Sequence, residues 1–337
     1  MRWGGAPTVV DMEYRPLGPS GLTVSVVGLG CNAFGSRIDE ERTREVVLAA
    51  IDAGITLFDT ADTYGLGSSE ELLGRALGSH RDQVVVATKF GMPASGLNGP
   101  DWQARASRGY IRRAVEGSLR RLGTDWIDLY QLHQPDLVTP YEETLTTLND
   151  LVTEGKIRYF GCSNFMAWEL VDAHWTAVSA GMAGFVSAQN EYSLYNRTAE
   201  AELVPACERL GIGLLPYFPL AYGLLTGKYM RGHSAPEGTR LASAGQRHRL
   251  ERADFDRVEA LERYAEERGI SILDVAIGGL AAQPAVVSVI AGATRPQQVE
   301  ANVKASLWQP TDPDLAALAD VNRAAAPGLT YSSFRAE

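Results

Sequence analysis

The sequence predicts an α/β protein built as a single (β/α)8 TIM barrel, in which eight parallel strands close into a ring inside a layer of helices. Three observations carry this prediction. Short apolar runs rich in Val, Ile and Leu occur eight times, helical patterns separate them, and no break in composition divides the 337 residues. A doubly wound open sheet is the structural alternative, although eight strand–helix units exceed what such a sheet normally needs.

The predicted strands are continuous apolar runs, a pattern typical of strands that are buried on both faces of a sheet. In chain order they are Val24–Leu29, Thr56–Asp59, Val84–Thr88, Ile127–Leu132, Ile157–Gly161, Phe185–Gln189, Ile212–Pro216 and Val287–Ile290. Residues 12–23 precede them, contain a Pro/Gly turn, and predict a small N-terminal β-hairpin.

The segments between the strands place apolar side chains at helical spacing, and several of them end at a glycine. They are Glu40–Ala53, Ser69–Leu77, Tyr110–Leu122, Tyr141–Thr153, Ala167–Val178, Ala199–Leu210, Phe255–Arg268 and Pro296–Ser306, with one more apolar helix over Ser271–Ala282. Met92–Arg108 and Tyr222–Glu251 interrupt this alternation and are expected as long loops at the C-terminal rim, where such loops often act as lids. The domain is expected to span residues 12–325, with 1–11 and 326–337 as terminal extensions.

The composition excludes several classes of protein. The chain carries 31 Lys and Arg against 41 Asp and Glu, a net charge of −10, which disfavours a nucleic-acid partner. No apolar stretch has the roughly 18 residues that a membrane span needs, and the first ten residues lack the apolar core of a signal peptide. Cys31, Cys162 and Cys207 form no CxxC pair, as expected in a reducing cytoplasm. We therefore expect a cytoplasmic protein without a nucleic-acid or membrane partner, and the oligomeric state stays open.

Ionisable side chains stand where the predicted strands end, and a barrel builds its active site at that rim. The second strand ends in Asp59 with Tyr64 in the following loop, the third is followed by Lys89, and the fourth by His133. Each residue alone also has a structural explanation, such as a capping Asp or a buried histidine. Together they indicate a proton donor, because an ammonium group lowers the pKa of a neighbouring phenol and a carboxylate holds that ammonium in place.

Other kinds of chemistry find less support. The five histidines are scattered without the spacing of zinc ligands, so no metal site is expected. The sequence contains neither GxSxG nor a Walker loop, which weakens hydrolase and phosphoryl-transfer interpretations.

The chain resembles the aldo-keto reductase family over about residues 12–325. The motifs that carry the resemblance are LFDTADTYG at 57–65, ATK at 87–89, DLYQLH at 128–133, GCSNF at 161–165, YFPL at 217–220 and GATRP at 292–296. It is nearer to bacterial sugar-aldehyde reductases and potassium-channel β-subunits than to mammalian aldose reductases.

This resemblance implies NADPH-dependent reduction of a small aldehyde or ketone to the alcohol. Tyr64 would protonate the carbonyl oxygen as hydride arrives, and Lys89 would lower the pKa of Tyr64. Asp59 would anchor Lys89, and His133 would orient the carbonyl group. Phe34 and Trp102, with Tyr64 and His133, are expected to line the substrate pocket, although each aromatic residue is equally open to a packing role.

The resemblance also implies a set of cofactor-binding residues. They are Cys31, Asn32, Asp59, Ser163, Asn164, Gln189, Tyr217, Phe218, Pro219, Leu220, Lys228, Arg240, Gly292, Thr294, Arg295, Gln298 and Asn302. In the family, the residues matching Ser163, Asn164 and Gln189 hold the nicotinamide carboxamide, and the residue matching Tyr217 stacks on the ring.

Some positions depart from the family pattern. Many members carry a Lys where Gly292 stands, so the 2′-phosphate of NADPH would need Thr294, Arg295 and either Lys228 or Arg240, and NADH stays possible. Two other functions also stay open: an NADP-binding regulatory protein like the channel β-subunits, and a sugar 1-dehydrogenase that runs the reaction in reverse. The channel subunits usually carry Asn where His133 stands, which favours catalysis here.

Overall fold

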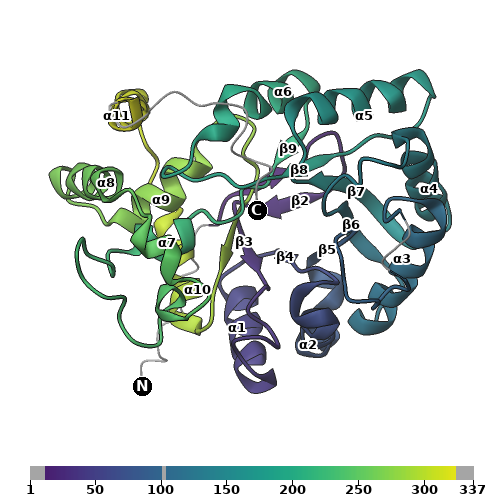
Figure 1. Cartoon of the computed structure of the whole chain (residues 1–337), viewed down its shortest axis with the longest axis horizontal. Coiled ribbons are helices and arrows are strands. Elements are labelled where there is room, and N and C mark those ends of the chain that lie inside the picture. Colours follow the sequence, from purple (N-terminus) through teal and green to yellow (C-terminus); the bar gives the residue numbers. More distant parts are fainter. Residues whose placement is uncertain (1–11, 101–103, 324–337) are drawn as a thin grey trace, which may run out of the picture.

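Eight parallel strands form the centre of the computed structural model, which describes residues 12–100 and 104–323 (Figure 1). The strands are β3 (Val27–Gly30), β4 (Leu57–Asp59), β5 (Val85–Phe90), β6 (Ile127–Leu132), β7 (Ile157–Ser163), β8 (Ser187–Gln189), β9 (Gly213–Leu214) and β10 (Val289–Gly292). Their order in the sheet is β10-β3-β4-β5-β6-β7-β8-β9. Parallel bridges from Leu214 to Val286 and from Tyr217 to Ile290 join the two ends. The predicted barrel is therefore confirmed.

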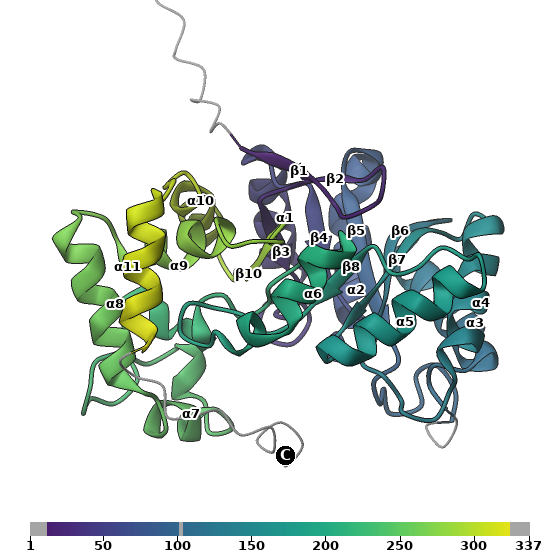
Figure 2. The same ribbon diagram turned by 90° about the horizontal axis from the view of Figure 1, so that it is seen from above.

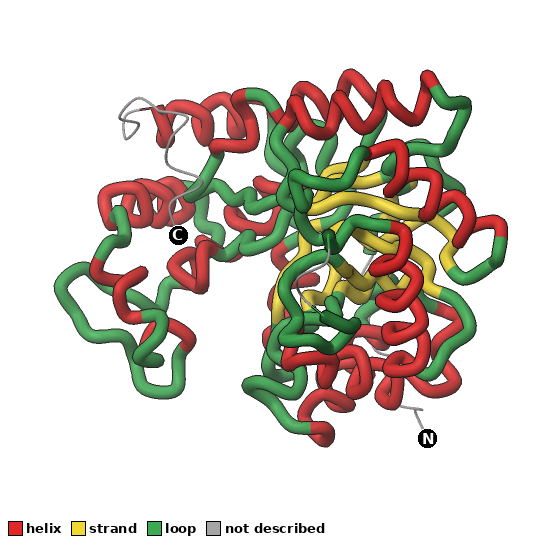
Figure 3. The backbone as a smooth tube through the Cα atoms, turned by 45° about the vertical axis from the view of Figure 1, so that its right-hand side comes forward, coloured by secondary structure: helices red, strands yellow, loops and turns green. Residues whose placement is uncertain are grey.

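Helices surround the sheet on the outside (Figure 3). They are α1 (Glu40–Asp52), α2 (Ser68–Leu77), α3 (Arg108–Leu122), α4 (Tyr141–Thr153), α5 (Ala167–Ser179), α6 (Leu203–Leu210), α7 (Arg247–Glu251), α8 (Phe255–Glu267), α9 (Ile272–Ala281), α10 (Pro296–Ala305) and α11 (Asp312–Arg323). Capping residues determine where several of these helices begin or end. The Asp39 carboxylate caps the start of α1, and Gly123 and Gly211 end α3 and α6 in the left-handed conformation.

One predicted strand and one predicted helix are each divided in the structure. The run Val24–Leu29 is not one strand, because the chain bends after Ser25, whose hydroxyl donates to the Val27 carbonyl at 2.6 Å. Its first part lies in β2 (Thr23–Ser25) and its second part in β3. The predicted helix Ala199–Leu210 is a short 3₁₀ turn over Thr198–Ala201 followed by α6, because Glu202 between them has a non-helical φ of −141°.

The N-terminal hairpin closes one end of the barrel. Its strands, β1 (Tyr14–Pro16) and β2, pair antiparallel, and Leu17 and Leu22 pack with interior residues of the barrel such as Leu57. Gly18 at the turn has a φ of +53°, and a Cβ there would lie 2.1 Å from the Val186 carbonyl oxygen, so only glycine fits. Figure 2 shows the hairpin and α7 at opposite ends of the molecule.

The long segment after β9 has an apolar core of its own. Side chains from this segment, among them Leu224, Tyr229 and Leu241, pack against α8, α9 and α11, for example against Leu261. The segment, predicted as a loop, contains 3₁₀ turns at Ala221–Thr226 and Arg240–Ala242 as well as α7. These apolar contacts hold the segment, and with it the polar residues that it carries, in place.

Candidate active site

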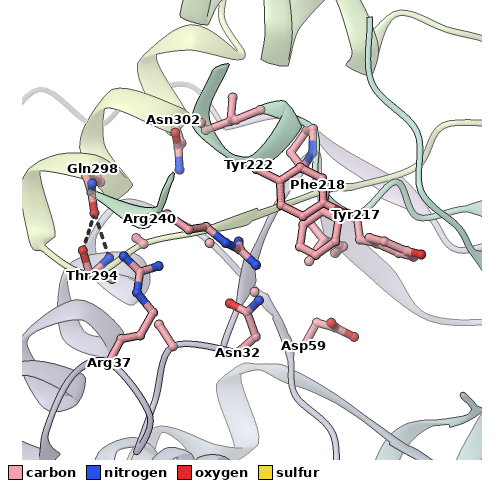
Figure 4. Close-up of a pocket in the computed structure, with 18 of the residues that line it drawn as sticks. Asn32, Arg37, Asp59, Tyr217, Phe218, Tyr222, Arg240, Thr294, Gln298 and Asn302 are labelled. Carbon is pink, nitrogen blue, oxygen red and sulfur yellow. Dashed lines mark hydrogen bonds between the residues drawn. The ribbon is translucent and has the colours of Figure 1, made fainter. Parts of the chain in front are cut away.

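A cavity of about 840 Å³ opens at the C-terminal ends of the strands. Almost all of the residues that the resemblance assigned to the cofactor line this cavity. These are Asn32, Asp59, Ser163, Asn164, Gln189, Tyr217, Phe218, Pro219, Leu220, Lys228, Arg240, Gly292, Thr294, Arg295, Gln298 and Asn302. Figure 4 labels several of them. Tyr64 and His133 line the same cavity.

The four predicted catalytic residues come together. The buried Lys89 Nζ lies 2.7 Å from Asp59 Oδ2 and donates to the Thr60 carbonyl at 2.8 Å and to the Tyr64 hydroxyl at 3.4 Å. The rings of Tyr64 and His133 meet edge to face with their centroids 6.0 Å apart. Lys89 thus lies behind the cavity wall and connects the Asp59 carboxylate to the phenol that faces the cavity.

Backbone contacts hold the loop that carries Tyr64. The amide of Thr60 donates to the Ala87 carbonyl at 2.8 Å, and the amide of Asp62 donates to the Lys89 carbonyl at 3.2 Å. Gly65 and Leu66 then adopt left-handed conformations, with φ values of 57° and 52°, and turn the chain toward α2. The loop between β4 and α2 is therefore tied to the strand that carries Lys89.

The surroundings determine the protonation state of each of these side chains. Burial raises the pKa of Tyr64 above its ordinary value, and the opposing effect of the Lys89 charge is smaller. Lys89 acts on this pKa in the expected, lowering direction, but burial outweighs its effect. Burial alone would lower the pKa of Lys89, but Asp59 and Tyr64 outweigh it and raise that pKa. Burial, and then the Lys89 charge, lower the pKa of His133 well below its usual value. At neutral pH the site holds a phenol, an ammonium and a neutral imidazole.

The inner end of the cavity carries connected amide and hydroxyl groups. Asn164 accepts from the Tyr217 hydroxyl at 2.7 Å and donates to the His133 carbonyl at 2.9 Å. The Ser163 hydroxyl donates to the Gln189 carbonyl at 2.8 Å. These bonds fix an aromatic ring and several polar side chains next to the Tyr64 hydroxyl.

The other end is cationic. The Arg240 guanidinium stacks on Phe218 and Tyr222, 4.9 Å and 5.2 Å from the ring centroids, and faces Arg37 across the cavity (Figure 4). Burial, followed by repulsion from Arg37, lowers the pKa of Arg240. Within residues 12–100 and 104–323, no carboxylate forms an ion pair with either arginine. Arg37 was not predicted as a site residue, because a single arginine in a loop has no recognisable sequence pattern and only the fold brings it opposite Arg240.

Two sequence-based assignments are not among the residues that line this cavity, and a third is not described. Cys31 and Phe34 are fully buried in the main apolar core and do not line the cavity. Trp102 lies outside the described residues.

Comparison with known proteins identifies the family. The model of the aldo/keto reductase family matches residues 26–323. The chain belongs to this family. The uncharacterized oxidoreductase YrpG of Bacillus subtilis is 38% identical over 302 residues, covering 87% of this chain and 91% of that protein. The probable voltage-gated potassium channel subunit beta of Oryza sativa subsp. japonica is 36% identical over 303 residues, covering 87% and 91%.

A third relative is named for a reduction. The versiconal hemiacetal acetate reductase of Aspergillus parasiticus is 36% identical over 303 residues, which cover 83% of this chain and 88% of that protein. The family and these relatives support an oxidoreductase that acts on small carbonyl compounds. In the part of the chain that the structure describes, no helix is both long and apolar enough to cross a membrane. The same residues contain no group of His, Cys, Asp or Glu side chains placed to hold a metal ion.

A buried polar cluster lies behind the Tyr64 loop of this aldo/keto reductase. Asp62 accepts from Asn98 Nδ2 at 2.6 Å, and its other oxygen has no hydrogen-bond partner among the described residues. The neighbouring Glu70 accepts from Arg121 Nε and from the Thr88 hydroxyl, both at 2.6 Å. The cluster therefore holds two buried carboxyl groups and one guanidinium. Burial, and then the nearby Glu70, raise the pKa of Asp62 to about 7.

The variant Asp62→Asn is expected to change how stability depends on pH. Because the pKa of Asp62 is raised in the folded protein, its contribution to stability is complete when it is protonated and is lost as the pH rises toward about 7. The amide cannot ionise, so the variant should gain about 2 kcal/mol of unfolding free energy relative to wild type between about pH 5 and pH 8. Urea unfolding at several pH values measures this. The exposed Asp52→Asn is the matched control, and parallel curves for wild type and Asp62→Asn would contradict the assignment.

Proposed function

We propose that this aldo/keto reductase reduces an aldehyde or ketone to the alcohol with NADPH, and that Tyr64 is the proton donor. The observation that carries the proposal is the connected chain from Asp59 through the buried Lys89 to the Tyr64 hydroxyl, with a neutral His133 on the same cavity wall. When bound, NADPH supplies the hydride to the carbonyl carbon.

The cavity residues fit this cofactor at both ends. The volume of about 840 Å³ lies in the upper part of the range of roughly 300–1,000 Å³ for small-molecule sites. Ser163, Asn164 and Gln189 would hold the carboxamide, and Tyr217 offers a fixed ring for stacking.

The cationic end suits the phosphate groups. Arg240 has no carboxylate partner among the described residues, and together with Lys228 it would face the pyrophosphate. Thr294 and Arg295 stand just before α10, where the helix N-terminus favours an anion, and would take the 2′-phosphate. Gln298 and Asn302, which also line this end, would contact the adenosine.

The protein side of the reaction follows from the protonation states. Tyr64 keeps its proton at neutral pH and can donate it to the carbonyl oxygen as negative charge develops there. The Lys89 ammonium, 3.4 Å from the phenol oxygen, then stabilises the phenolate, and Asp59 keeps the ammonium in place. His133 is neutral and buried, so a ring N–H can orient the carbonyl oxygen without competing as an acid. The same residues would serve oxidation of an alcohol in the reverse direction.

A regulatory protein that binds the cofactor without turnover is the second candidate. The 36% identity to a probable potassium channel subunit beta favours it. Against it stands His133, which lines the cavity beside Tyr64. We further propose a cytoplasmic location, which the three free and buried cysteines support.

Steady-state turnover separates these candidates. Reduction of a reactive aromatic aldehyde, followed as loss of reduced-nicotinamide absorbance, should proceed with kcat/KM at least about tenfold higher for NADPH than for NADH, because Thr294 and Arg295 can bind the extra phosphate. Equal values with both cofactors would contradict the assignment of a 2′-phosphate site. Tight NADPH binding without turnover of any aldehyde would favour the regulatory candidate.

A further inference from the structure

The Asp59 carboxylate has more hydrogen-bond donors than its partnership with Lys89 requires. Its Oδ2 accepts from Lys89 at 2.7 Å. Its Oδ1 accepts from two side-chain amides, Gln189 Nε2 at 2.8 Å and Gln131 Nε2 at 3.2 Å. All four side chains are buried, so water does not compete for these contacts. Both carboxylate oxygens are thereby fixed.

The two glutamines stand in different positions. Gln189 lines the cavity and is one of the three residues proposed to hold the cofactor carboxamide. Gln131 does not line the cavity, and its Oε1 has no hydrogen-bond partner among the described residues. Only its amide nitrogen can donate to a carboxylate, so the contact with Asp59 also sets the orientation of the Gln131 amide.

The barrel interior makes room for the Gln131 side chain. Gln131 pairs with Lys89 on β5 and with Gly161 on β7. A Cβ at Gly161 would lie 2.3 Å from Ser187 Oγ and 3.5 Å from Gln131 Cγ. The glycine is therefore required by Ser187, and Gln131 packs directly beside it.

We propose that Gln131 is a positioning residue, whose amide holds Asp59 Oδ1 so that Oδ2 stays aimed at Lys89 when Gln189 engages the cofactor. The inference rests on the proposed function, because that function gives Gln189 a second partner, the cofactor carboxamide, besides Asp59 Oδ1. Gln131 then acts on the proton donor through Asp59 and Lys89, and contacts neither substrate nor cofactor. A carboxylate held by a donor on each oxygen has little freedom to rotate, which keeps the Lys89 ammonium next to the Tyr64 hydroxyl.

Two variants of Gln131 test this. Gln131→Leu keeps a side chain of similar size without the donor, so kcat should fall about tenfold while KM for the aldehyde and NADPH affinity change less than about twofold. Gln131→Glu restores a donor only when its carboxyl group is protonated. It should recover most of the wild-type kcat at about pH 5, and then lose activity as the pH rises, because a second carboxylate would face Asp59.

Thermal unfolding gives a readout that does not depend on turnover. A buried Glu beside Asp59 has a raised pKa in the folded state, so its stability contribution is lost as the pH rises, and the unfolding temperature of Gln131→Glu should fall between about pH 5 and pH 8. The curve of Gln131→Leu should run parallel to that of wild type. Wild-type kcat in Gln131→Leu, or the same pH profile for both variants, would overturn the proposal. Absence of turnover in wild type would instead refute the proposed function, and the unfolding curves would still decide whether Gln131 supports Asp59.

Discussion

Tyr64→Phe is expected to lower kcat at least about 100-fold, while NADPH affinity stays within about twofold of wild type. The variant removes the hydroxyl to which Lys89 donates, and general acid catalysis is typically worth 10²–10⁴-fold. The ring itself remains, so the cavity keeps its shape and the His133 contact. Steady-state kinetics with an aromatic aldehyde and a fluorescence titration with NADPH measure the two effects.

Tyr159→Phe is the matched control for this substitution. This substitution also removes one hydroxyl, but at the other end of the barrel, where the Tyr159 hydroxyl accepts from the Gly21 amide at 3.1 Å. Its kcat should stay close to that of wild type. A loss of less than about tenfold in Tyr64→Phe would remove Tyr64 from its role as the proton donor.

Lys89→Met is expected to be the most destabilising single substitution at the site. It leaves the Asp59 carboxylate buried without a cation, and breaking a buried ion pair from one side costs about 3–5 kcal/mol. The turnover should also fall steeply, because no positive charge remains to stabilise a Tyr64 phenolate. Urea unfolding gives the first effect and steady-state kinetics the second.

The double variant Asp59→Asn/Lys89→Met separates stability from catalysis. Removing the unpaired carboxylate together with the ammonium should restore much of the lost unfolding free energy, whereas turnover should stay low. If Lys89→Met unfolds at the same urea concentration as wild type, the pair does not form the buried contact described here.

The barrel and the positions of the candidate catalytic residues were predictable because both depend on local sequence. A continuous apolar run such as Ile127–Leu132 has few structures open to it other than a buried strand, and β6 has these same bounds. The rim position of Asp59, Lys89 and His133 then followed from where the strands end. The cofactor residues were assigned by resemblance, and nearly all of them line one cavity.

The features that the sequence did not predict depend on contacts between distant segments. The bend after Ser25 uses hydrogen bonds between Ser25 and Thr56, which lies just before β4, and it divides an apolar run that is continuous in the sequence. Arg37 faces Arg240 only because two loops, far apart in the chain, meet across the cavity. The net pKa direction of Tyr64 depends on how much burial outweighs the Lys89 charge, and spacing alone holds no information on burial.

A single-turnover experiment tests the central claim most directly. Wild-type protein is mixed with a stoichiometric amount of NADPH, an aromatic aldehyde is added, and the alcohol is quantified alongside the loss of reduced-nicotinamide absorbance. The proposed reduction predicts one alcohol for each NADPH consumed, with Tyr64→Phe slower by at least about 100-fold. Bound NADPH that survives the aldehyde unchanged in the wild type would contradict it.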